Sequence, residues 1–364
     1  MAKVYPLIFE PILQPRIWGG RRLQSVLGKR LPEGRPIGES WQVADLEHAQ
    51  SVVACGPMRG RTLPELVRLW DKDLIGRAEL IDGRFPLLIK FLDAQEILSV
   101  QVHPDRATAQ RLGGSTRIKN EAWYVIDATD DAFIYHGLRE NVDAVQLQRA
   151  LRDGRVEELL RRVPVSKGHC YYLPSGTVHA LGGGVLVAEI QTPSDVTYRL
   201  YDWDRVDQAT GLKRELHIEE ALASAAFTSS EAEQRPEHAA SLWTSTTSLC
   251  RCESFVIERV RMADGVEMEI PYAEMVIWIV LEGRGTISCE GSSTPTSFGV
   301  GDTIVLPAGM KKGRVRTAAN CMWLEVTVPI ESSLAHHERL EREARTSPTR
   351  TAARFVPLRV PPSP

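Results

Sequence analysis

The sequence lacks the features that would assign it to a membrane, secreted or thiolate-zinc class. Its 364 residues contain no apolar run approaching the ~20 residues of a membrane-spanning helix. The N-terminal segment has no apolar run of the length typical of a signal peptide. The six cysteines form no C-x-x-C pair, so a thiolate zinc site is not predicted. We therefore expect reduced cysteines and a cytoplasmic protein.

The sequence also lacks an excess of charge of either sign. Lysine and arginine total 44 residues, aspartate and glutamate total 47, and the formal net charge at pH 7 is −3. Bulk charge therefore gives no reason to expect a nucleic-acid or anionic-membrane partner. We expect a small-molecule partner and a monomer or small homo-oligomer.

The composition is that of a globular protein, with 43% hydrophobic residues. The length is too great for one small core and suits two domains. Helical spacing of apolar residues predicts a helix over 62–80, with Thr62 as N-cap and Glu65 completing a capping box. Residues 141–163 are also helical in composition, and Gly154 is expected to divide them into two helices.

Short apolar strands dominate the rest of the chain. Residues 85–102 read as two strands joined by a turn, and four further strands are predicted at Cys170–Leu173, Gly184–Ile190, Met275–Leu281 and Asp302–Leu306. Many short strands separated by Gly and Pro turns indicate a sandwich or barrel, so the fold class is mainly β.

One internal repeat favours a duplicated domain. Residues 168–176 (GHCYYLPSG) match residues 301–309 (GDTIVLPAG) in the spacing of their glycines, apolar strand and Pro-x-Gly turn. We predict a first domain at 1–227, a polar linker at 228–241, a second domain at 242–330 and a charged, Pro-rich tail at 331–364 that is disordered or loosely packed.

Three places in the first domain bring metal-capable side chains next to turns. Gln101 and His103 face the same way if they lie on a strand, which Pro104 then ends. Glu121 begins an apolar strand, and His179 follows a tight turn. The repeat has Lys312 in the place of His179 and no histidine between 238 and 336, so the second domain is expected to have no metal ligands.

Two imidazoles, one carboxylate and one amide oxygen suit zinc or another borderline divalent ion and leave room for water or substrate. The alternative is that these histidines are hydrogen-bonded core residues, which is the commoner fate of a buried histidine. Glutamine is also a poor metal ligand in general. The residue pattern alone leaves both interpretations open.

A series of longer motifs carries a family resemblance. They are FPLLIKFL (85–92), LSVQVHPD (98–105), KNEAWY (119–124), LPSGTVHA (173–180) and EIQTPSDVTYRLYD (189–202), with weaker matches at 18–20 and 38–41. In this order the motifs resemble those of the type I mannose-6-phosphate isomerases, particularly their short bacterial form. The resemblance spans about residues 5–220, and the C-terminal part matches only in general pattern.

The resemblance implies two cupin-type β-barrel (jelly-roll) domains, with helical insertions in the N-terminal part. It implies an isomerase that interconverts mannose 6-phosphate and fructose 6-phosphate through an enediol. It also implies one Zn²⁺ per chain and a set of site residues: the ligands Gln101, His103, Glu121 and His179, the catalytic residues Lys119, Glu189 and Arg199, and the substrate contacts Lys90 and Ser99.

The chemistry of aldose–ketose isomerisation needs a base for a carbon-bound proton and positive charge near the developing oxyanion. Glu189 or Lys119 could be that base, and Arg199 could stabilise the charge or hold an anionic group. Without the resemblance, simpler roles are favoured: a strand carboxylate paired with a nearby base, a solvated turn lysine, and an arginine in a structural ion pair with Asp202 or Asp195.

The sequence departs from the family pattern at a few positions. Ser175 replaces the usual alanine before Gly176, Arg106 replaces an acidic residue, and His136 replaces a Leu or Gly. Arg106 and His136 are expected to alter the rim of the pocket. Three other functions compete: isomerisation of a different sugar phosphate, sugar binding without catalysis, and a metal-dependent oxygenase or epimerase activity on the same fold.

Overall fold

The computed structural model describes residues 4–113, 117–207, 211–227 and 237–330, and the protein is mainly β. The strands of its N-terminal part are β1 Leu7–Ile8, β2 Ile12–Gly20, β3 Ile37–Val43, β4 Leu88–Ala94, β5 Val100–Val102, β6 Glu121–Ala128, β7 Phe133–Leu138, β8 Leu160–Pro164, β9 Cys170–Leu173, β10 His179–Leu181, β11 Val185–Gln191 and β12 Tyr198–Tyr201.

The strands of the C-terminal part are β13 His238–Ala240, β14 Thr244–Arg251, β15 Val256–Met262, β16 Glu267–Glu269, β17 Val276–Glu282, β18 Arg284–Ser288, β19 Thr296–Gly299, β20 Thr303–Leu306, β21 Arg314–Thr317 and β22 Cys321–Thr327. The helices are short: α1 Arg22–Ser25, α2 Leu63–Trp70, α3 Lys72–Ile75, α4 Arg106–Leu112, α5 Ala144–Arg152, a 3₁₀ turn at Val156–Leu159, and α6 Ile218–Ser224. Within the described residues, none of these helices has the length and apolar character needed to cross a membrane.

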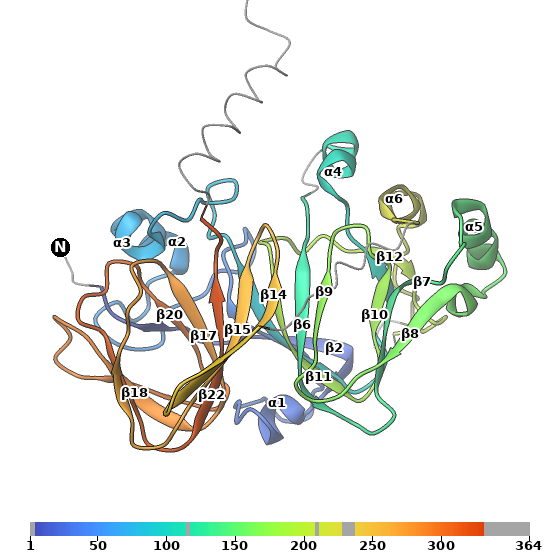
Figure 1. Cartoon of the computed structure of the whole chain (residues 1–364). Helices are drawn as coiled ribbons and strands as arrows, with labels where there is room; N and C mark the ends of the chain where they lie inside the picture. Colours follow the sequence, from blue (N-terminus) through green and yellow to red (C-terminus); the bar gives the residue numbers. More distant parts are fainter. Residues whose placement is uncertain (1–3, 114–116, 208–210, 228–236, 331–364) are drawn as a thin grey trace, which may run out of the picture. The chain divides into compact units, whose positions relative to one another are not determined.

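The N-terminal half contains two antiparallel sheets, which are drawn mainly in blue and green in Figure 1. One has six strands in the order β2-β3-β4-β11-β6-β9, and the other has five in the order β12-β5-β10-β7-β8. Buried side chains such as Trp123, Val187 and Leu181 come from both sheets and form one hydrophobic cluster. Antiparallel strands with alternating side chains can therefore direct polar residues from two sheets into one interior.

The C-terminal half repeats this strand order. Its seven-stranded sheet runs β1-β20-β17-β22-β15-β14-β13, and its four-stranded sheet runs β16-β21-β18-β19. The order β9-β6-β11-β4-β3 of the first half therefore corresponds to β20-β17-β22-β15-β14 of the second. The two copies of the sequence repeat, on β9 and β20, occupy the same place in this order. Even single pairs correspond, because Trp123 lies opposite Glu189 and Trp278 lies opposite Glu325.

The predicted helix at 62–80 begins as expected but is shorter. Thr62 and Glu65 form the predicted capping box at the start of α2. The helix ends at Asp71, whose φ of 41° lies in the left-handed region, and the chain continues as the separate short helix α3. The break lets α2 and α3 turn their apolar residues toward the same core, since Leu66, Trp70 and Leu74 all belong to it.

Residues 141–163 differ more from the prediction. The first expected helix is present as α5, but the second is only a 3₁₀ turn. Residues 160–164 instead form β8, which pairs with β7. Pairing along β7 and burial of Leu160 outweigh the helical propensity of this segment. The strands predicted at Cys170–Leu173, Gly184–Ile190, Met275–Leu281 and Asp302–Leu306 are confirmed to within two residues. The two strands predicted within 85–102 are present as β4 and β5, and the first begins three residues later than expected.

The two halves share a core that crosses the predicted domain boundary. Strand β1 pairs with β20 of the C-terminal sheet. Carbonyl oxygens of Asp73 and Leu74 accept hydrogen bonds from the backbone of Gly309 and Ala308, so the helical insertion of the N-terminal part packs on the C-terminal half (Figure 1). The predicted linker includes His238–Ala240, which form β13. Residues 228–236 and 331–364 lie outside the described residues, and the boundaries at 227 and 242 stay a prediction.

Candidate metal centre

Neighbouring strands of the five-stranded sheet align three of the predicted site residues. In the antiparallel register Arg199 of β12 lies opposite Gln101 of β5, and Gln101 lies opposite His179 of β10. Directly opposite residues of a sheet share a face. The register therefore brings one predicted catalytic residue and two predicted ligands into a single row.

β5 ends at Val102, so His103 lies just after the strand and not on it as predicted, and Pro104 follows. The side chain of His103 is buried, and Nδ1 lies 3.0 Å from the backbone carbonyl oxygen of Val196. A carbonyl can only accept, so Nδ1 carries the proton and Nε2 keeps its lone pair. This fixed tautomer is typical of a histidine that coordinates a metal through Nε2.

His179 is held in the same way. It follows the Pro174–Gly176 turn, in which Gly176 adopts a φ of +92° that side chains disfavour. Its Nδ1 lies 2.8 Å from the carbonyl oxygen of Thr177, which can only accept, so Nδ1 carries a proton and Nε2 is the ring nitrogen that faces Glu121. The turn is anchored by a hydrogen bond from the backbone N–H of Gly176 to the carbonyl oxygen of His103, at 2.8 Å.

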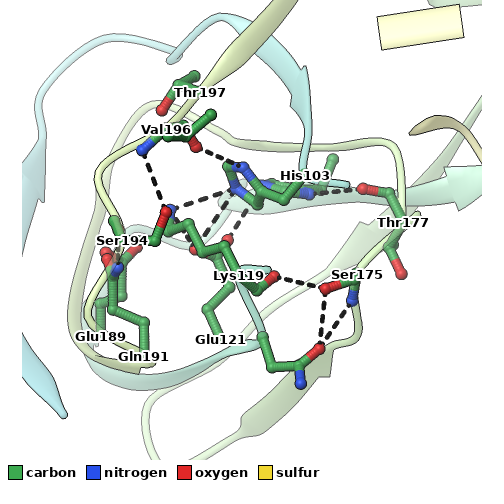
Figure 2. Close-up of polar contacts among 12 residues, drawn as sticks. His103, Lys119, Glu121, Ser175, Thr177, Glu189, Gln191, Ser194, Val196 and Thr197 are labelled. Carbon is green, nitrogen blue, oxygen red and sulfur yellow. Dashed lines mark hydrogen bonds and ion pairs between the residues drawn. The ribbon is translucent and has the colours of Figure 1, made fainter. Parts of the chain in front are cut away.

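Glu121 reaches this point from the six-stranded sheet, where it is the first residue of β6. Its Oε1 lies 3.0 Å from Nε2 of His179, and its Oε2 lies 3.6 Å from Nε2 of His103. Ligand atoms of the three residues all lie within 4.8 Å of one another, and all three side chains are buried. In Figure 2 the side chains of His103 and Glu121 point toward each other, with Lys119 beside them.

The protonation states suit a cation. Burial alone would raise the pKa of Glu121, but Lys119 and the two histidines hold it well below its ordinary value. Burial, reinforced by the charge of Lys119, lowers the pKa of His103 to about 3. At neutral pH the group therefore offers an anionic carboxylate and a neutral imidazole, as metal ligands require.

Unused hydrogen-bonding capacity also fits a metal. Oε1 of Glu121 and Nε2 of His179 are buried without a hydrogen bond of acceptable geometry, whereas Oε2 of Glu121 has an ion-pair contact with Lys119. Buried polar atoms are rarely left in this state unless an ion or a ligand completes them. With the amide of Gln101 opposite His179, this donor set fits one borderline divalent ion.

Lys119 is not the solvated turn lysine that the residue pattern allowed. It is 5% exposed, and its Nζ lies 2.5 Å from Oε2 of Glu121 and 3.2 Å from Nε2 of His103. Burial alone would lower its pKa, but the carboxylates of Glu121 and Glu189 raise it. The side chain is therefore an ammonium ion, and it places a fixed positive charge at the centre.

Glu189 lies in a second row of paired polar groups on the six-stranded sheet. It is 3% exposed and lies opposite both Lys90 and Trp123. Its Oε1 lies 3.3 Å from Nζ of Lys90, and its Oε2 accepts a hydrogen bond from Nε1 of Trp123 at 2.9 Å. The ion pair with a base that the simpler interpretation allowed is therefore present, directly beside the candidate metal group.

The structure does not show Arg199 in the ion pair with Asp202 or Asp195 that the simpler interpretation predicted. Its Nη1 donates to the backbone carbonyl oxygen of Glu215 at 2.7 Å. Asp202 instead pairs with Arg205 and Arg214. The other candidate partner, Asp195, pairs with His48 at 3.1 Å. Among the predicted substrate contacts, Lys90 faces Glu189, and Ser99 is buried two residues before Gln101.

Sequence reasoning missed two residues that organise the site. Gln191 lies opposite Glu121 and is completely buried. Its amide donates to the carbonyl oxygens of Thr192 and Ser194, which shapes the loop whose Val196 carbonyl holds His103. Trp123 holds Glu189. Because strand side chains alternate, Trp123 shares a face with Glu121, and Gln191 shares a face with Glu189. This alternation is the feature of the sequence from which both residues could have been predicted.

A cleft of about 500 Å³ is formed by residues that neighbour the site residues in the chain. Ile118 and Thr192, which adjoin Lys119 and Gln191, line it together with Arg106 and Arg117. Arg106, where the sequence departs from the family pattern, lies on the wall of this cleft, and its effect on the substrate pocket stays a prediction. His136 lies opposite His179 in the sheet, and its Nε2 is 2.9 Å from the carbonyl oxygen of Tyr172.

Known proteins are similar to this chain along most of their length. A model of the catalytic domain of type I phosphomannose isomerase matches residues 7–128. Mannose-6-phosphate isomerase ManA of Bacillus subtilis is 37% identical over 319 residues, which cover 87% of this chain and 98% of that protein. The mannose-6-phosphate isomerase of Streptococcus mutans is 35% identical over 313 residues, covering 84% and 93%.

Solved structures agree with the sequence comparison. The crystal structure of the Bacillus subtilis mannose 6-phosphate isomerase matches with a TM-score of 0.80 at 32% identity, and the match covers 89% of this chain and 100% of that chain. The similarity therefore includes both halves and extends well beyond the matched catalytic segment.

Proposed function

The chain belongs to the type I phosphomannose isomerases, and on this premise we propose that it interconverts mannose 6-phosphate and fructose 6-phosphate. The observation that carries the proposal is the buried group of His103, Glu121 and His179, whose ligand atoms converge beside Lys119 and Glu189. Several charged groups within a closed interior exceed what sugar binding alone needs, so an isomerase is favoured over a binding protein.

We assign the metal as one Zn²⁺ per chain, held by Gln101, His103, Glu121 and His179. Two imidazoles with a carboxylate are a ligand set that zinc accepts readily. A bound zinc ion would act as a Lewis acid on the sugar oxygens. The protein's own contribution is the fixed Nδ1 donation of both histidines, which keeps each Nε2 in place.

We assign the proton transfer between C2 and C1 of the open-chain sugar to the carboxylate of Glu189. Lys119 is held as an ammonium ion by its carboxylate neighbours, so it is a poor base. Its charge instead stabilises the oxyanion that develops as the proton leaves. To Arg199, which lies opposite Gln101 in the sheet, we assign the stabilisation of negative charge on the substrate.

Lys90 and Ser99 are assigned to substrate contacts. Lys90 is buried next to Glu189 and lies 4.9 Å from the ring centre of Trp41, so its position is fixed before substrate arrives. A fixed charge costs little reorganisation on binding. Ser99 offers a hydroxyl near β5, suited to a phosphate or sugar oxygen.

At the level of the whole chain we propose two cupin-type barrels, the second of which has no metal ligands. The matching strand orders of the two halves support this. The six cysteines form no disulfide, which is consistent with a cytoplasmic location. A monomer or small homo-oligomer stays the prediction for the assembly.

A coupled assay for fructose 6-phosphate formation tests the function. We expect turnover of mannose 6-phosphate to exceed that of other aldose phosphates and of free mannose in a panel at equal concentrations. A chain that binds mannose 6-phosphate without turnover would favour the binding protein. Faster turnover of another aldose phosphate would assign a different substrate.

A further inference from the structure

Asn120 lies between two residues of the metal centre but serves neither directly. Its neighbours Lys119 and Glu121 both reach the centre, whereas the Asn120 side chain, 5% exposed, makes its contacts elsewhere. The amide has partners on both of its atoms, and they come from two separate parts of the chain. Asn120 therefore joins segments that the sequence keeps far apart.

The oxygen of the amide contacts the turn that delivers His179. Oδ1 of Asn120 accepts a hydrogen bond from the backbone N–H of Ser175 at 3.0 Å, and Oγ of Ser175 lies at the same distance. Oγ of Ser175 is also 3.1 Å from the carbonyl oxygen of Lys119, as the dashed lines at Ser175 in Figure 2 indicate. These bonds fasten the start of β6 to the Pro174–Gly176 turn.

The nitrogen of the amide contacts the C-terminal half. Nδ2 of Asn120 lies 3.3 Å from Oε1 of Glu253 and 3.3 Å from Oγ of Ser254, in the turn between β14 and β15. The orientation of the amide follows from its partners, because a backbone N–H requires an acceptor and a carboxylate requires a donor.

Packing keeps the β14–β15 turn in place. Phe255 is completely buried and meets the ring of Tyr172 on β9 edge-to-face, with ring centres 6.3 Å apart. The backbone N–H of Cys252 closes the turn on the carbonyl oxygen of Phe255 at 3.0 Å. A rigid turn from the second half thus presents two polar groups to Asn120.

We propose that Asn120 is a positioning residue through which the β14–β15 turn of the C-terminal half fixes the spacing of the metal ligands Glu121 and His179. The proposal rests on the proposed metal centre. It gives the half without metal ligands a role in the activity of the other half. Partners that orient metal ligands are commonly worth 10–100-fold in metal affinity.

The test measures zinc affinity by competition with a chromogenic chelator, together with the rate of fructose 6-phosphate formation. We expect Asn120→Ala to weaken zinc binding by about 10–100-fold. The variant Glu253→Ala with Ser254→Ala leaves the first half intact, and we expect it to weaken zinc binding by about tenfold. Saturating zinc should restore most of the rate in the double variant.

Two controls separate positioning from general destabilisation. Glu253→Gln keeps an acceptor oxygen for Nδ2 of Asn120 and should retain the affinity of the unaltered protein. Ser293→Ala, at an exposed position of the C-terminal half, should change neither affinity nor unfolding temperature. Unaltered zinc affinity in the Glu253→Ala, Ser254→Ala double variant would overturn the proposal. An unaltered protein that binds no zinc would overturn the metal centre itself as well.

Discussion

At the scale of single residues, the two histidines show how backbone groups decide the chemistry of a side chain. Each Nδ1 faces a carbonyl oxygen, of Val196 for His103 and of Thr177 for His179. Each ring is therefore committed to one tautomer before a metal arrives. Preorganisation of this kind lowers the cost of binding, because the ligands lose little freedom when the ion is bound.

Replacing one of these rings tests the ligand assignment. We expect His179→Ala to lower zinc affinity by more than ~100-fold, since loss of a ligand exceeds the usual effect of losing its supporting partner. Metal content after dialysis and the rate of fructose 6-phosphate formation measure the change. His238→Ala, on the exposed strand β13, is the matched control and should retain both. Normal zinc content in His179→Ala would remove it from the ligand set.

The corresponding Trp–Glu pairs of the two halves provide a matched control for testing the catalytic role of Glu189. Trp123→Phe keeps the aromatic ring but removes the N–H that Oε2 of Glu189 accepts. We expect kcat to fall roughly tenfold, which corresponds to about 1.4 kcal/mol for one hydrogen bond to a charged group. Trp278→Phe changes the corresponding residue of the other half and should leave kcat unchanged. Equal effects of the two substitutions on kcat would contradict the role of Glu189.

At the scale of elements, the sequence predicted what depends on local chemistry. The N-cap of α2 was predictable because Thr62 and Glu65 satisfy each other's backbone groups without help from the rest of the chain. The end of α2 at Asp71 and the conversion of residues 160–164 to β8 depend on distant partners in the core and on β7. The secondary structure of a short segment of mixed propensity is decided by the residues it packs against. The sequence alone therefore did not predict the end of α2 or the strand β8.

The segment after β12 provides a prediction about pH. Burial alone would raise the pKa of Asp202, but Arg214 and Arg205 hold it below its ordinary value. The unfolded chain therefore binds this proton more readily than the folded chain. It follows that ionised Asp202 stabilises the fold above about pH 4 and loses this contribution as the pH falls further.

We expect Asp202→Asn to lower the free energy of unfolding by about 1–3 kcal/mol at pH 7. The difference from the unaltered protein should narrow as the pH is lowered from 5 toward 3, because the native carboxylate then becomes protonated as well. Urea unfolding of both proteins at several pH values measures this difference in the free energy of unfolding. A difference that stays constant over this range would show that the charge of Asp202 has no part in the effect.

At the scale of the whole molecule, the residue pattern grouped the candidate ligands but did not show which sheets would meet. Gln101 and His103 could be paired from their spacing. The residue pattern also put the carboxylate of Glu121 in the same donor set, but only the structure shows that Glu121 approaches from the other sheet. Burial of Lys119 and the row through Lys90, Glu189 and Trp123 depend on strand pairing between distant segments. A single sequence does not show which distant segments pair as strands.

The shared core predicts that the first half does not fold alone. One hydrophobic cluster contains Leu7, Phe9 and Leu74 together with Phe255, Ile277 and Leu324 of the C-terminal half. A fragment of residues 1–227 would expose these apolar side chains, and β1 would lose its partner β20. We expect the fragment to aggregate or to lack a cooperative unfolding transition in circular dichroism. A soluble, cooperatively folding fragment would support an independent domain ending at 227.

The central claim is that Gln101, His103, Glu121 and His179, brought together from two sheets, hold one divalent cation that the isomerisation requires. The most direct measurement titrates zinc into chelator-treated protein while fructose 6-phosphate formation is followed. The account predicts no activity in the metal-free protein and a linear rise that ends at one equivalent of zinc per chain. Full activity in protein that elemental analysis finds free of metal would contradict it.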